Sequence, residues 1–495
     1  MAIDILRSLK SVEVAIGALA GCHASQPASV VIVQALIDLK RSACDWDELP
    51  LLEAQLAQAI ATGDSNVHPW SVLFQSGTAL QQRDCAIGRI KSLKPVAALP
   101  FRPPGHGSSS RLKVGFVSSG FGPHAVTVLA GDMLASLQAH SFDVHLLATR
   151  MFPGSAWVPD SADYAGIHDV SSASAASIAA LVQTLRLDVL IDVDGWADGG
   201  RPEIFSYRAA PIQLAWLGYP GTTGAPWFDG IVVDRFIVPP DQQDAFSESV
   251  AYLPRCYQPT SPPEKVPSPP ERVACGLPAE ACLVYGCFNE PTKMGPRSFA
   301  RMLDVLAQVP ESVLWLLEPA GRGADRLRHL AAGRGVDPDR LVFRPKLPYL
   351  SYLGHYRHVD MVLDTEIYNG HTVSSDALQM GVPVLTRPGE VMAARVAGSL
   401  NHHLGLDDCN VATDEAFVAQ ATRFARDPAW RDSVRARLRH ARGAPGVFDP
   451  AGYANDLAGL VFDLLARTAS AAPPADPLAA ASIRKKFRSP SGAQP

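Results

Sequence analysis

The chain has 495 residues, 47% of them hydrophobic, and this size accommodates roughly two to four domains of ordinary dimensions. Its formal net charge of -5 argues against a nucleic-acid-binding protein, which is expected to carry a strongly basic face. The eight cysteines form no CxxC pair and no metal-like spacing, which suits reduced thiols in the cytoplasm. No run approaches the ~18 apolar residues of a membrane span, so no membrane partner is expected.

Residues 1 to about 95 are predicted to be helical, because apolar residues recur at steps of three and four along "VVIVQALIDLKRSACDWDELPLLEAQLAQAIA". Within this segment "LAGC", ending at Cys22 and preceded by Arg7 and Lys10, looks like a bacterial lipoprotein cleavage box. Asp4 and Glu13 flank a short apolar run, however, and an amphipathic helix explains the stretch as well. The segment ends at "LPFRPPGHGSSSR", which is typical of a linker.

From Lys113 onward, short apolar runs alternate with helical stretches. The first series of predicted strands is "KVGFVS", "FDVHLLAT", "LDVLIDVDG", "PIQLAWLGYPG" and "DGIVVD". After the proline-rich segment 257–278, a second series follows, with "ACLVYGCFN", "SVLWLLEP", "RLVFRPKL", "VDMVLDT" and "VPVLTRPGE". Such alternation predicts parallel sheets covered by helices on both faces, with ligands at the carboxyl ends of the strands.

The fold class predicted is therefore α/β, with two doubly wound Rossmann-like lobes that face a cleft and an all-α segment before them. The predicted domains are a helical segment and linker at 1–108, a first lobe at 109–258, a proline-rich linker at 259–280, a second lobe at 281–468, and a disordered tail at 469–495.

The stretch "NGHTVSSDALQMGVP", residues 369–383, directly follows a predicted strand and begins a predicted helix. Amides around His371, Thr372 and Val373 can hold a diphosphate there, since the amino-terminal end of a helix favours anions. Gly370 lets the backbone approach a ligand closely, and Asp376 can accept hydrogen bonds from ribose hydroxyls. A plain helix cap with a solvated aspartate is the alternative.

Four further segments carry candidate residues. "FNEPTKMGP" places Lys293 just past a strand, where a leaving diphosphate needs a cation, although taken alone the segment favours an ordinary surface lysine. "VSSGFGPHAV" places His124 after the first strand of the first lobe, where an imidazole can move a proton or contact a substrate; a structural loop histidine is the alternative. "WLGYPGTTGAPWFD" is a glycine-rich loop, and Arg395 follows another strand end as an anion partner or an ordinary helix arginine.

Some patterns suggest metal sites but have simpler explanations. The carboxylates of "DVDG", Asp192 to Gly195, have a spacing that can hold a divalent cation, yet they also end an apolar strand where Asp commonly starts a turn. The histidines of "HYRH" and "NHH" come without nearby cysteine or carboxylate ligands. They are interpreted as surface or packing residues, and no metal ion is expected.

Taken together, the motifs resemble the catalytic region of the O-GlcNAc transferase and SPINDLY family, and most closely its bacterial members. The resemblance covers about residues 40–465 and rests on "VGFVSSGFGPH", "DGWADGGRPEIFSYRAAPIQLAWLGYPGTTGAPWFD", "CFNEPTKMGP", "VPESVLWLL", "LDTEIYNGHTVSSDALQMGVPVLTRPGE" and "ARVAGSLNHHLGL". It implies a GT-B architecture and an inverting, metal-independent transfer of N-acetylglucosamine from UDP-GlcNAc to Ser or Thr hydroxyls of an acceptor polypeptide. No cofactor is implied, and the helical segment corresponds to a shortened tetratricopeptide region.

The resemblance also assigns roles to individual residues. His371 and Thr372 match the start of the diphosphate-binding helix, Asp376 matches the ribose ligand, and Lys293 matches the lysine that neutralises the leaving group. His124 matches a first-lobe active-site histidine, with Lys293 the second residue of the catalytic pair. The nucleotide-sugar site is completed by Gly221, Thr222, Asn289, Glu290, Leu347, Tyr352, Gly370, Val373 and Arg395, in which Tyr352 stacks on uracil and Leu347 reads that base through its main chain.

Three departures from the family pattern bear on activity. Ala125 and Val126 replace the usual Pro-Thr after the histidine, which Pro123 precedes; Glu290 replaces an amide; and Val373 replaces a second threonine. A carboxylate beside a diphosphate costs free energy through like-charge repulsion. A nucleotide-sugar-binding pseudoenzyme, or a GT-B transferase with another donor such as GDP-fucose or UDP-glucose or a non-protein acceptor, therefore stays open. The "NGHT" sequence favours UDP-GlcNAc, and the acceptor's proton can pass to His124 or to the diphosphate itself.

Overall fold

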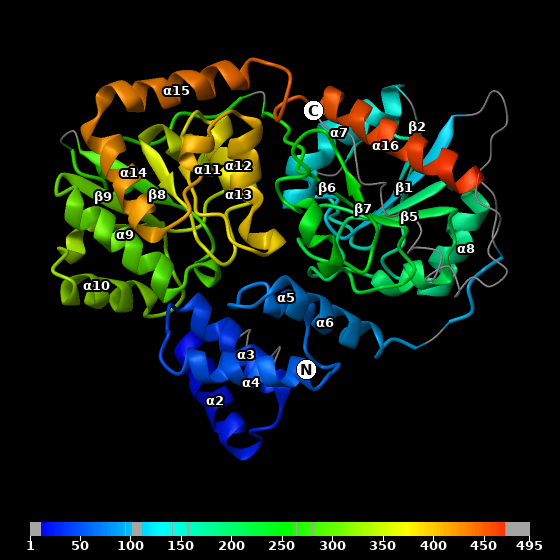
Figure 1. Cartoon of the computed structure of the whole chain (residues 1–495), viewed down its shortest axis with the longest axis horizontal. Coiled ribbons are helices and arrows are strands. Elements are labelled where there is room, and N and C mark those ends of the chain that lie inside the picture. The colour runs from blue at the N-terminus through cyan, green and yellow to red at the C-terminus, as the bar shows by residue number, and fades with distance from the viewer. Residues whose placement is uncertain are drawn as a thin grey trace. The chain divides into compact units, whose positions relative to one another are not determined.

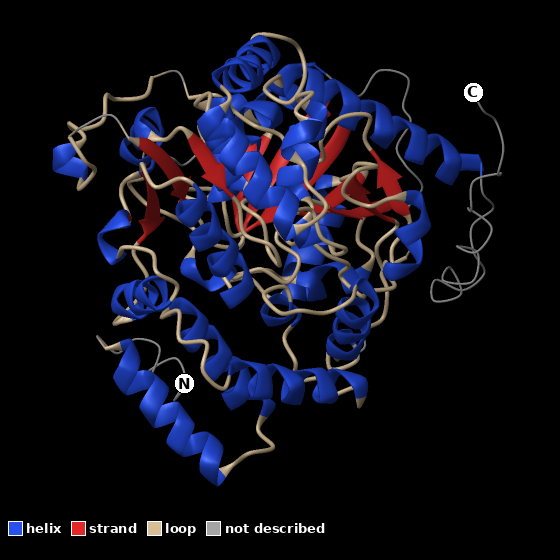
Figure 2. Ribbon diagram, turned by 60° about the vertical axis from the view of Figure 1, so that its left-hand side comes forward, coloured by secondary structure: helices blue, strands red, loops and turns tan. Residues whose placement is uncertain are grey.

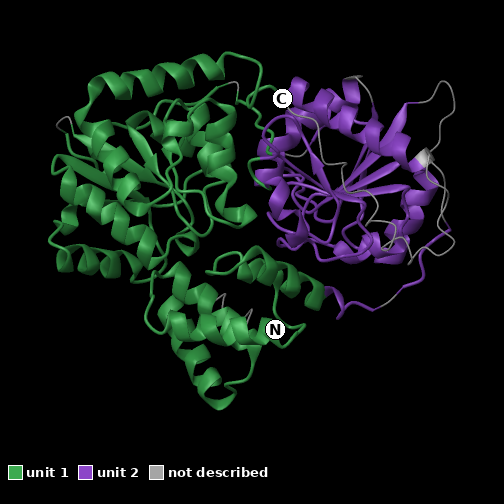
Figure 3. Ribbon diagram, viewed as in Figure 1, with its two compact units in different colours: residues 1–89, 236–238, 258–449 green, residues 90–235, 239–257, 450–495 purple. Residues whose placement is uncertain are grey.

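A computed structural model describes residues 11–94, 96–100, 111–140, 142–155, 159–263, 265–279 and 282–470. The chain forms two compact units (Figure 3). Unit 1 comprises Met1–Arg89, Phe236–Val238 and Gln258–Asp449, and unit 2 comprises Ile90–Arg235, Pro239–Tyr257 and Pro450–Pro495. Of the predicted disordered tail at 469–495, residues 469 and 470 end a helix and residues 471–495 lie outside the described residues. Most of the predicted linker before Arg111 and the leader residues Asp4, Arg7 and Lys10 also lie outside them.

Unit 2 is built on a seven-stranded parallel sheet with the strand order β3-β2-β1-β4-β5-β6-β7 (Figure 1). The strands are β1 (Leu112–Ser118), β2 (Phe142–Ala148), β3 (Gly166–Asp169), β4 (Val189–Asp192), β5 (Ile212–Ala215), β6 (Gly230–Val233) and β7 (Val250–Tyr252). Its helices are α7 (Ala125–His140), α8 (Ala175–Leu185) and α16 (Pro450–Ser470), with short 3-10 turns at η1 (Ser161–Asp163), η2 (Pro202–Tyr207) and η3 (Pro240–Ala245). The last helix, α16, packs against α7.

Unit 1 contains a five-stranded parallel sheet with the order β10-β9-β8-β11-β12. Its strands are β8 (Leu283–Cys287), β9 (Ser312–Leu317), β10 (Leu341–Arg344), β11 (Met361–Leu363) and β12 (Val384–Leu385). Its α-helices are α9 (Pro296–Gln308), α10 (Gly323–Gly333), α11 (Tyr349–His355), α12 (Thr372–Gln379), α13 (Val396–His403), α14 (Asp414–Arg426) and α15 (Pro428–Arg442). Short turns lie at η4 (Val273–Cys275), η5 (Pro291–Lys293), η6 (Pro338–Arg340), η7 (Tyr356–His358), η8 (Met392–Ala394) and η9 (Asp407–Cys409).

The strands of both sheets lie between helices (Figure 2), which explains their near-continuous apolar sequences. Every residue of β4, β5, β6, β9 and β11 is buried. All ten strands predicted from the sequence are confirmed, while β3 and β7 were not predicted. No helix within the described ranges is long and apolar enough to cross a bilayer.

The amino-terminal helices belong to unit 1 and have an apolar core of their own. They are α2 (Val12–Ser25), α3 (Val30–Ser42), α4 (Leu49–Ala61), α5 (Pro69–Val72) and α6 (Ala79–Ile90), as the apolar spacing predicted. Their core includes Leu36, Ile37, Leu56, Val67 and Cys85. The "LAGC" stretch lies within α2, where the side chain of Leu19 is buried.

Candidate functional site

A buried carboxylate fixes the loop that leads to the candidate helix start in unit 1. Asp364 follows β11, and its Oδ1 accepts hydrogen bonds from the Gly370 amide at 2.7 Å and from Asn289 Nδ2 at 3.0 Å. Its Oδ2 accepts from Thr386 Oγ1 at 2.7 Å. Burial raises the pKa of Asp364, and these hydrogen bonds oppose that effect. One side chain therefore joins the loops after β8, β11 and β12.

The helix α12 begins at Thr372, as the "NGHT" motif predicted. His371 precedes the first helical residue, and its carbonyl accepts from the amides of Ser374 and Ser375 at 3.1 and 3.0 Å. Earlier amides of the first turn have no intrahelical acceptor, so they are available to an anion. A Cβ on Gly370 would lie 2.4 Å from Ser374 Oγ and 2.8 Å from Asn289 Oδ1, so only glycine fits there.

Lys293 lies beside this helix start and supplies a positive charge. It ends η5, and its Nζ donates to the Asn369 carbonyl at 3.0 Å and lies 3.8 Å from the centroid of the Tyr368 ring. Burial lowers the pKa of Lys293 to about 8, while nearby Asp364 and Glu290 act in the opposite direction. The ammonium form is therefore present at neutral pH.

Several polar atoms at the helix start have no partner. Within the described part of the chain, Asn289 Oδ1, Asn369 Oδ1 and Ser374 Oγ are buried and make no hydrogen bond. Each parent residue is almost fully buried. An unpaired buried polar group costs about 1–3 kcal/mol. A polar ligand bound near Gly370 would remove this cost by pairing with these atoms.

Glu290, the residue that departs from the family pattern, has a basic partner. Its Oε1 lies 2.7 Å from the Nζ of Lys346, which follows β10. The two side chains are 50% and 73% exposed, so the ion pair adds little stability. The carboxylate of Glu290, which the sequence marked as an unfavourable negative charge, therefore lies beside the ammonium group of Lys346.

His371 does not carry positive charge in this arrangement. Burial lowers the pKa of its imidazole well below the usual value, and Lys293 adds to the effect. Its Nε2 donates to the Ala393 carbonyl at 3.0 Å, and its ring centroid lies 4.6 Å from that of Tyr368. The neutral ring therefore fixes the turn before α12, and the cationic charge comes from Lys293.

Asp376 is not a solvated helix residue, because its side chain is only 2% exposed. Its Oδ1 accepts a hydrogen bond from the Tyr349 hydroxyl at 2.7 Å. Burial raises the pKa of Asp376 to about 7. Behind this pair, the hydroxyls of Tyr352 and Tyr356 lie 2.7 Å apart, and Tyr356 donates to the carbonyl of Val373 at 3.0 Å. Tyrosines of α11 and η7 thus support the first turns of α12.

The two residues expected to contact a base follow β10. The Tyr352 ring is buried and has the Arg344 guanidinium 5.0 Å from its centroid. Leu347 lines a pocket of about 810 Å³ with, among others, Trp315, Arg344 and the proline-rich segment 267–270. Among the described residues, Trp315 Nε1 and Arg344 Nε are buried without a hydrogen-bond partner. This pocket is therefore lined by apolar side chains together with residues whose buried polar atoms are unpaired.

Arg395 precedes α13, and its guanidinium donates to the carbonyls of Gly389 at 2.8 Å and Phe236 at 2.9 Å. In this structure it is engaged with backbone, which matches the ordinary-arginine alternative more closely than an anion partner. Val373 lies in the first turn of α12, next to Thr372, where its residue type adds no hydroxyl group.

The remaining candidates belong to unit 2. His124 is exposed at the start of α7, where its Nδ1 accepts from the Val126 amide at 3.3 Å. Gly221 and Thr222 lie in the buried loop after β5. The Thr222 hydroxyl donates to Glu248 Oε2 at 2.6 Å, and this hydrogen bond stabilises the loop.

The carboxylates of "DVDG" also hold a loop of unit 2. Asp192 accepts from the amides of Asp194 and Gly195 at 3.1 and 2.9 Å. Asp194 accepts from the Ser118 hydroxyl at 2.6 Å and the Ser119 amide at 2.5 Å. The turn interpretation of this motif is therefore confirmed. Among the described residues, no three His, Cys, Asp or Glu side chains are grouped as metal ligands would be.

The other discounted histidines pack against their surroundings. His355 Nδ1 contacts the Ser351 carbonyl at 2.7 Å, and the His358 Nε2 donates to Pro270 at 2.8 Å. His402 lies 2.8 Å from Asp407 and stacks on Phe236.

In unit 1 the structure thus brings together, around one helix start, Asn289, Glu290, Lys293, Gly370, His371, Thr372, Val373 and Asp376. Sequence reasoning did not single out Asp364, Tyr368, Tyr349 or Lys346. Asp364 follows an apolar strand, and this position was a usable signal. The other three are recognisable only from contacts between distant segments.

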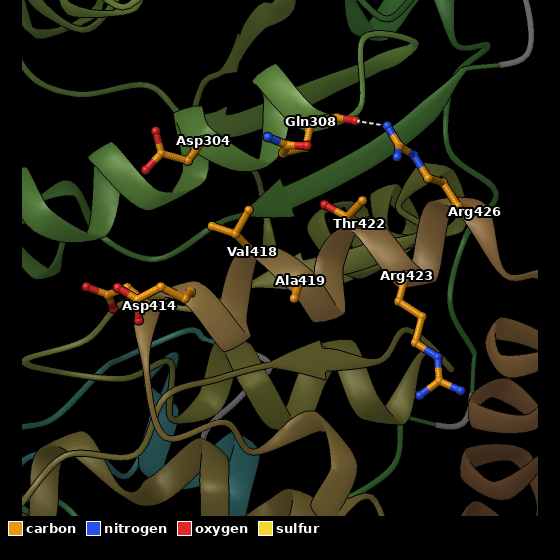
Figure 4. Close-up of a pocket in the computed structure, with 9 residues that line it drawn as sticks. Asp304, Gln308, Asp414, Val418, Ala419, Thr422, Arg423 and Arg426 are labelled. Atoms are coloured by element: carbon orange, nitrogen blue, oxygen red, sulfur yellow. Dashed lines mark hydrogen bonds between the residues drawn. The ribbon is translucent and has the colours of Figure 1, made fainter.

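A further pocket, of about 660 Å³, opens between α9 and α14 and contains none of the predicted site residues (Figure 4). Asp304 and Asp414 lie toward one end of it and Arg423 and Arg426 toward the other, with Arg426 donating to the Gln308 carbonyl at 2.7 Å. Among the described residues that line it, Arg423 donates to Asp427 at 3.3 Å, outside the pocket lining.

Comparison with known proteins identifies a matching family and several relatives. The model of glycosyl transferase family 41 matches residues 53–260 and 262–457. A probable UDP-N-acetylglucosamine--peptide N-acetylglucosaminyltransferase, SEC, of Arabidopsis thaliana is 33% identical over 71% of this chain and 37% of its own length. The UDP-N-acetylglucosamine--peptide N-acetylglucosaminyltransferase of Caenorhabditis elegans is 25% identical over 74% of this chain and 42% of its own. The chain therefore spans less than half the length of these relatives.

The solved structure of a Thermobaculum terrenum O-GlcNAc transferase mutant matches the fold with a TM-score of 0.79 at 24% identity, covering 93% of this chain and 89% of that one. The match confirms the predicted GT-B fold class, with two Rossmann-like sheets and an amino-terminal helical segment. The family match confirms the resemblance recognised from the motifs. The chain belongs to glycosyl transferase family 41.

Proposed function

We propose that this protein is an inverting, metal-independent glycosyltransferase that moves N-acetylglucosamine from UDP-GlcNAc to Ser or Thr hydroxyls of polypeptides. The observation that carries the proposal is the ammonium of Lys293 beside the amino-terminal end of α12, where its Nζ donates to the Asn369 carbonyl. Two relatives are named for the same donor and for peptide acceptors, which supports the choice of substrates.

In the proposed reaction, the acceptor oxygen attacks the anomeric carbon while the bond to the diphosphate breaks, so the configuration inverts. Negative charge then develops on the leaving diphosphate. The ammonium of Lys293 and the first amides of α12 are fixed before the reaction, and preorganised donors of this kind contribute several kcal/mol. In this proposal they supply the positive charge that a divalent cation supplies in other transferases.

We also propose which residues contact the ribose and the base of the nucleotide. Asp376 would accept hydrogen bonds from the ribose hydroxyls, one turn beyond Thr372. Tyr352 and Leu347 would contact the base next to the pocket after β10. His124, at the start of α7 in unit 2, and the diphosphate itself are the two groups proposed to take the acceptor's proton.

The test is incubation of the purified protein with radiolabelled UDP-GlcNAc and a lysate of the host cell. Labelled protein is expected, and Lys293→Ala should reduce labelling by about 100-fold or more. The exposed Lys265→Ala is the matched control and should label normally. Thermal stabilisation by GDP but not by UDP would overturn the donor. Binding of UDP-GlcNAc with neither transfer nor donor hydrolysis would instead identify a nucleotide-sugar-binding pseudoenzyme.

A further inference from the structure

The amino-terminal helices pack directly against the part of unit 1 that carries Lys293. The helix α3 contacts η5, the turn that ends at Lys293. Nearby, the Ala320 amide donates to the Ser42 carbonyl at 2.9 Å, and Arg326 donates to the Ala43 carbonyl at 3.0 Å. Both bonds join the end of α3 to the segment after β9, and the helical segment and the five-stranded sheet belong to the same compact unit.

A second contact reaches the site through aromatic rings. Phe74 follows α5, and its ring centroid lies 5.0 Å from that of Tyr368. Trp70 lies within α5, 6.2 Å from Tyr368 in an edge-on arrangement and 5.8 Å from Phe74. Such ring pairs contribute about 0.5–1.5 kcal/mol beyond their buried area, and they fix the orientation of the rings as well as their position.

Tyr368 is the residue on which these contacts converge. Its side chain is 4% exposed, and its ring faces the ammonium of Lys293 at 3.8 Å and the imidazole of His371 at 4.6 Å. An ammonium over the face of an aromatic ring is attracted to the ring's quadrupole. The plane of Tyr368 therefore affects where the Lys293 ammonium lies, and that plane is set by Phe74 and Trp70.

The aromatic pair is itself held by the helical core. The side chain of Gln34, on α3, accepts from the His68 amide at 2.6 Å, directly before α5. The flanking residues Val67, Val72 and Leu73 are buried. The same helix, α3, thus contacts η5 on one side and anchors α5 on the other.

We propose that Trp70 and Phe74 are positioning residues for the diphosphate site, acting on Lys293 through the ring of Tyr368. The inference rests on the proposed role of Lys293 as the ligand of the diphosphate. It makes the amino-terminal helical segment a working part of the nucleotide site, with a function separate from any contact it makes with an acceptor.

The test compares UDP with uridine, because only UDP has the phosphates that the ammonium would contact. Calorimetric titration of Phe74→Ala should show UDP affinity reduced by about fivefold and uridine affinity unchanged. In a Lys293→Ala background the same substitution should have no further effect on UDP affinity. Phe74→Leu, which keeps more apolar volume, repeats the measurement if Phe74→Ala does not fold.

Trp46→Ala is the matched control. Trp46 also joins the helical segment to the rest of unit 1, with its ring 5.9 Å from that of Phe299 on α9, whereas the described ring contacts of Tyr368 are with Trp70, Phe74 and His371. It should lower thermal stability without changing the ratio of UDP to uridine affinity. An equal loss of both affinities in Phe74→Ala, or additive losses with Lys293→Ala, would overturn the inference. Failure of the unmodified protein to bind UDP would instead reject the proposed function.

Discussion

If Asp376 binds the ribose as proposed, the hydrogen bond that it accepts from Tyr349 makes nucleotide affinity depend on pH. Burial raises the pKa of Asp376 to about 7, and the Tyr349 hydroxyl acts in the opposite direction by donating to the carboxylate at 2.7 Å. An ionised carboxylate accepts both this bond and those from ribose hydroxyls, whereas a protonated one accepts them less well. UDP affinity is therefore expected to fall as the pH drops through about 7.

Substituting Tyr349→Phe removes the donor, so the pKa of Asp376 should rise further. The midpoint of the acid limb of UDP affinity should move upward, by up to about one pH unit. The alkaline limb, set by the pKa of Lys293 at about 8, should stay in place. Titration calorimetry between pH 5.5 and 9, roughly the range of both groups, measures both limbs. Asp376→Asn is the control and should remove the acid limb; an unchanged limb in Tyr349→Phe would contradict the argument.

Individual residues were predictable where a motif fixes their local position. Lys293 lies in the segment that follows β8, and Gly370 and His371 lie between β11 and the start of α12, as the order of motifs along the sequence predicted. The partner of Glu290 was not predictable, because Lys346 is on the loop after a different strand and the pairing exists only once β8 and β10 flank β9 in the folded sheet. The burial of Asp376 was likewise invisible in a sequence that allowed a solvated aspartate.

At the scale of one element, the start of α12 depends on the absence of a side chain at residue 370. A Cβ there would meet Ser374 Oγ at 2.4 Å and Asn289 Oδ1 at 2.8 Å. Gly370→Ala should therefore displace the first turn, lower the free energy of unfolding by about 1–3 kcal/mol, and reduce UDP affinity by about tenfold or more. Chemical denaturation and calorimetry measure the two effects.

Gly295 provides a matched control, since it directly precedes α9 and a Cβ on it would meet no atom within 4 Å. Gly295→Ala is expected to change stability by less than about 0.5 kcal/mol and leave UDP affinity unchanged. If Gly370→Ala bound UDP as well as the control does, the close-packed helix start would not be the phosphate site.

The elements that the sequence predicted are those with strong local signals. The fully buried strands β4, β5 and β9 have near-continuous apolar sequences, and their burial depends on helices covering both faces of a sheet. The missed strands β3 and β7 are short edge strands, and β3 is partly exposed along its whole length. An edge strand needs no apolar run, because its position is fixed by pairing with the strand beside it.

For the whole molecule, the order of segments along the chain differs from their grouping in space. The helices before residue 90 join the sheet formed by residues 283–385, and α16 at the end of the described chain joins the earlier sheet of unit 2. Amphipathic spacing shows that a helix has an apolar face but does not identify the sheet that covers it. This grouping therefore could not be inferred from periodicity.

Because α16 belongs to unit 2, the stability of unit 2 is expected to depend on this helix. Tyr453 is buried, its hydroxyl accepts from Trp216 Nε1 at 3.0 Å and donates to the Tyr257 carbonyl, and its ring centroid lies 6.1 Å from that of Trp216. Tyr453→Ala should lower the free energy of unfolding of unit 2 by about 3–5 kcal/mol, because it leaves a cavity and removes a buried hydrogen-bonding group.

UDP affinity, assigned here to residues of unit 1, should change by less than about twofold in Tyr453→Ala under conditions where both units are folded. Phe462→Ala, on the same helix, is the matched control, since Phe462 is 46% exposed and its loss should cost about 1 kcal/mol or less. Denaturant titration followed by tryptophan fluorescence, with and without saturating UDP, separates a transition that UDP stabilises from one that it does not. If Tyr453→Ala shifted the UDP-stabilised transition and left the other unchanged, α16 would support unit 1, and the assignment of this helix to the seven-stranded unit would be wrong.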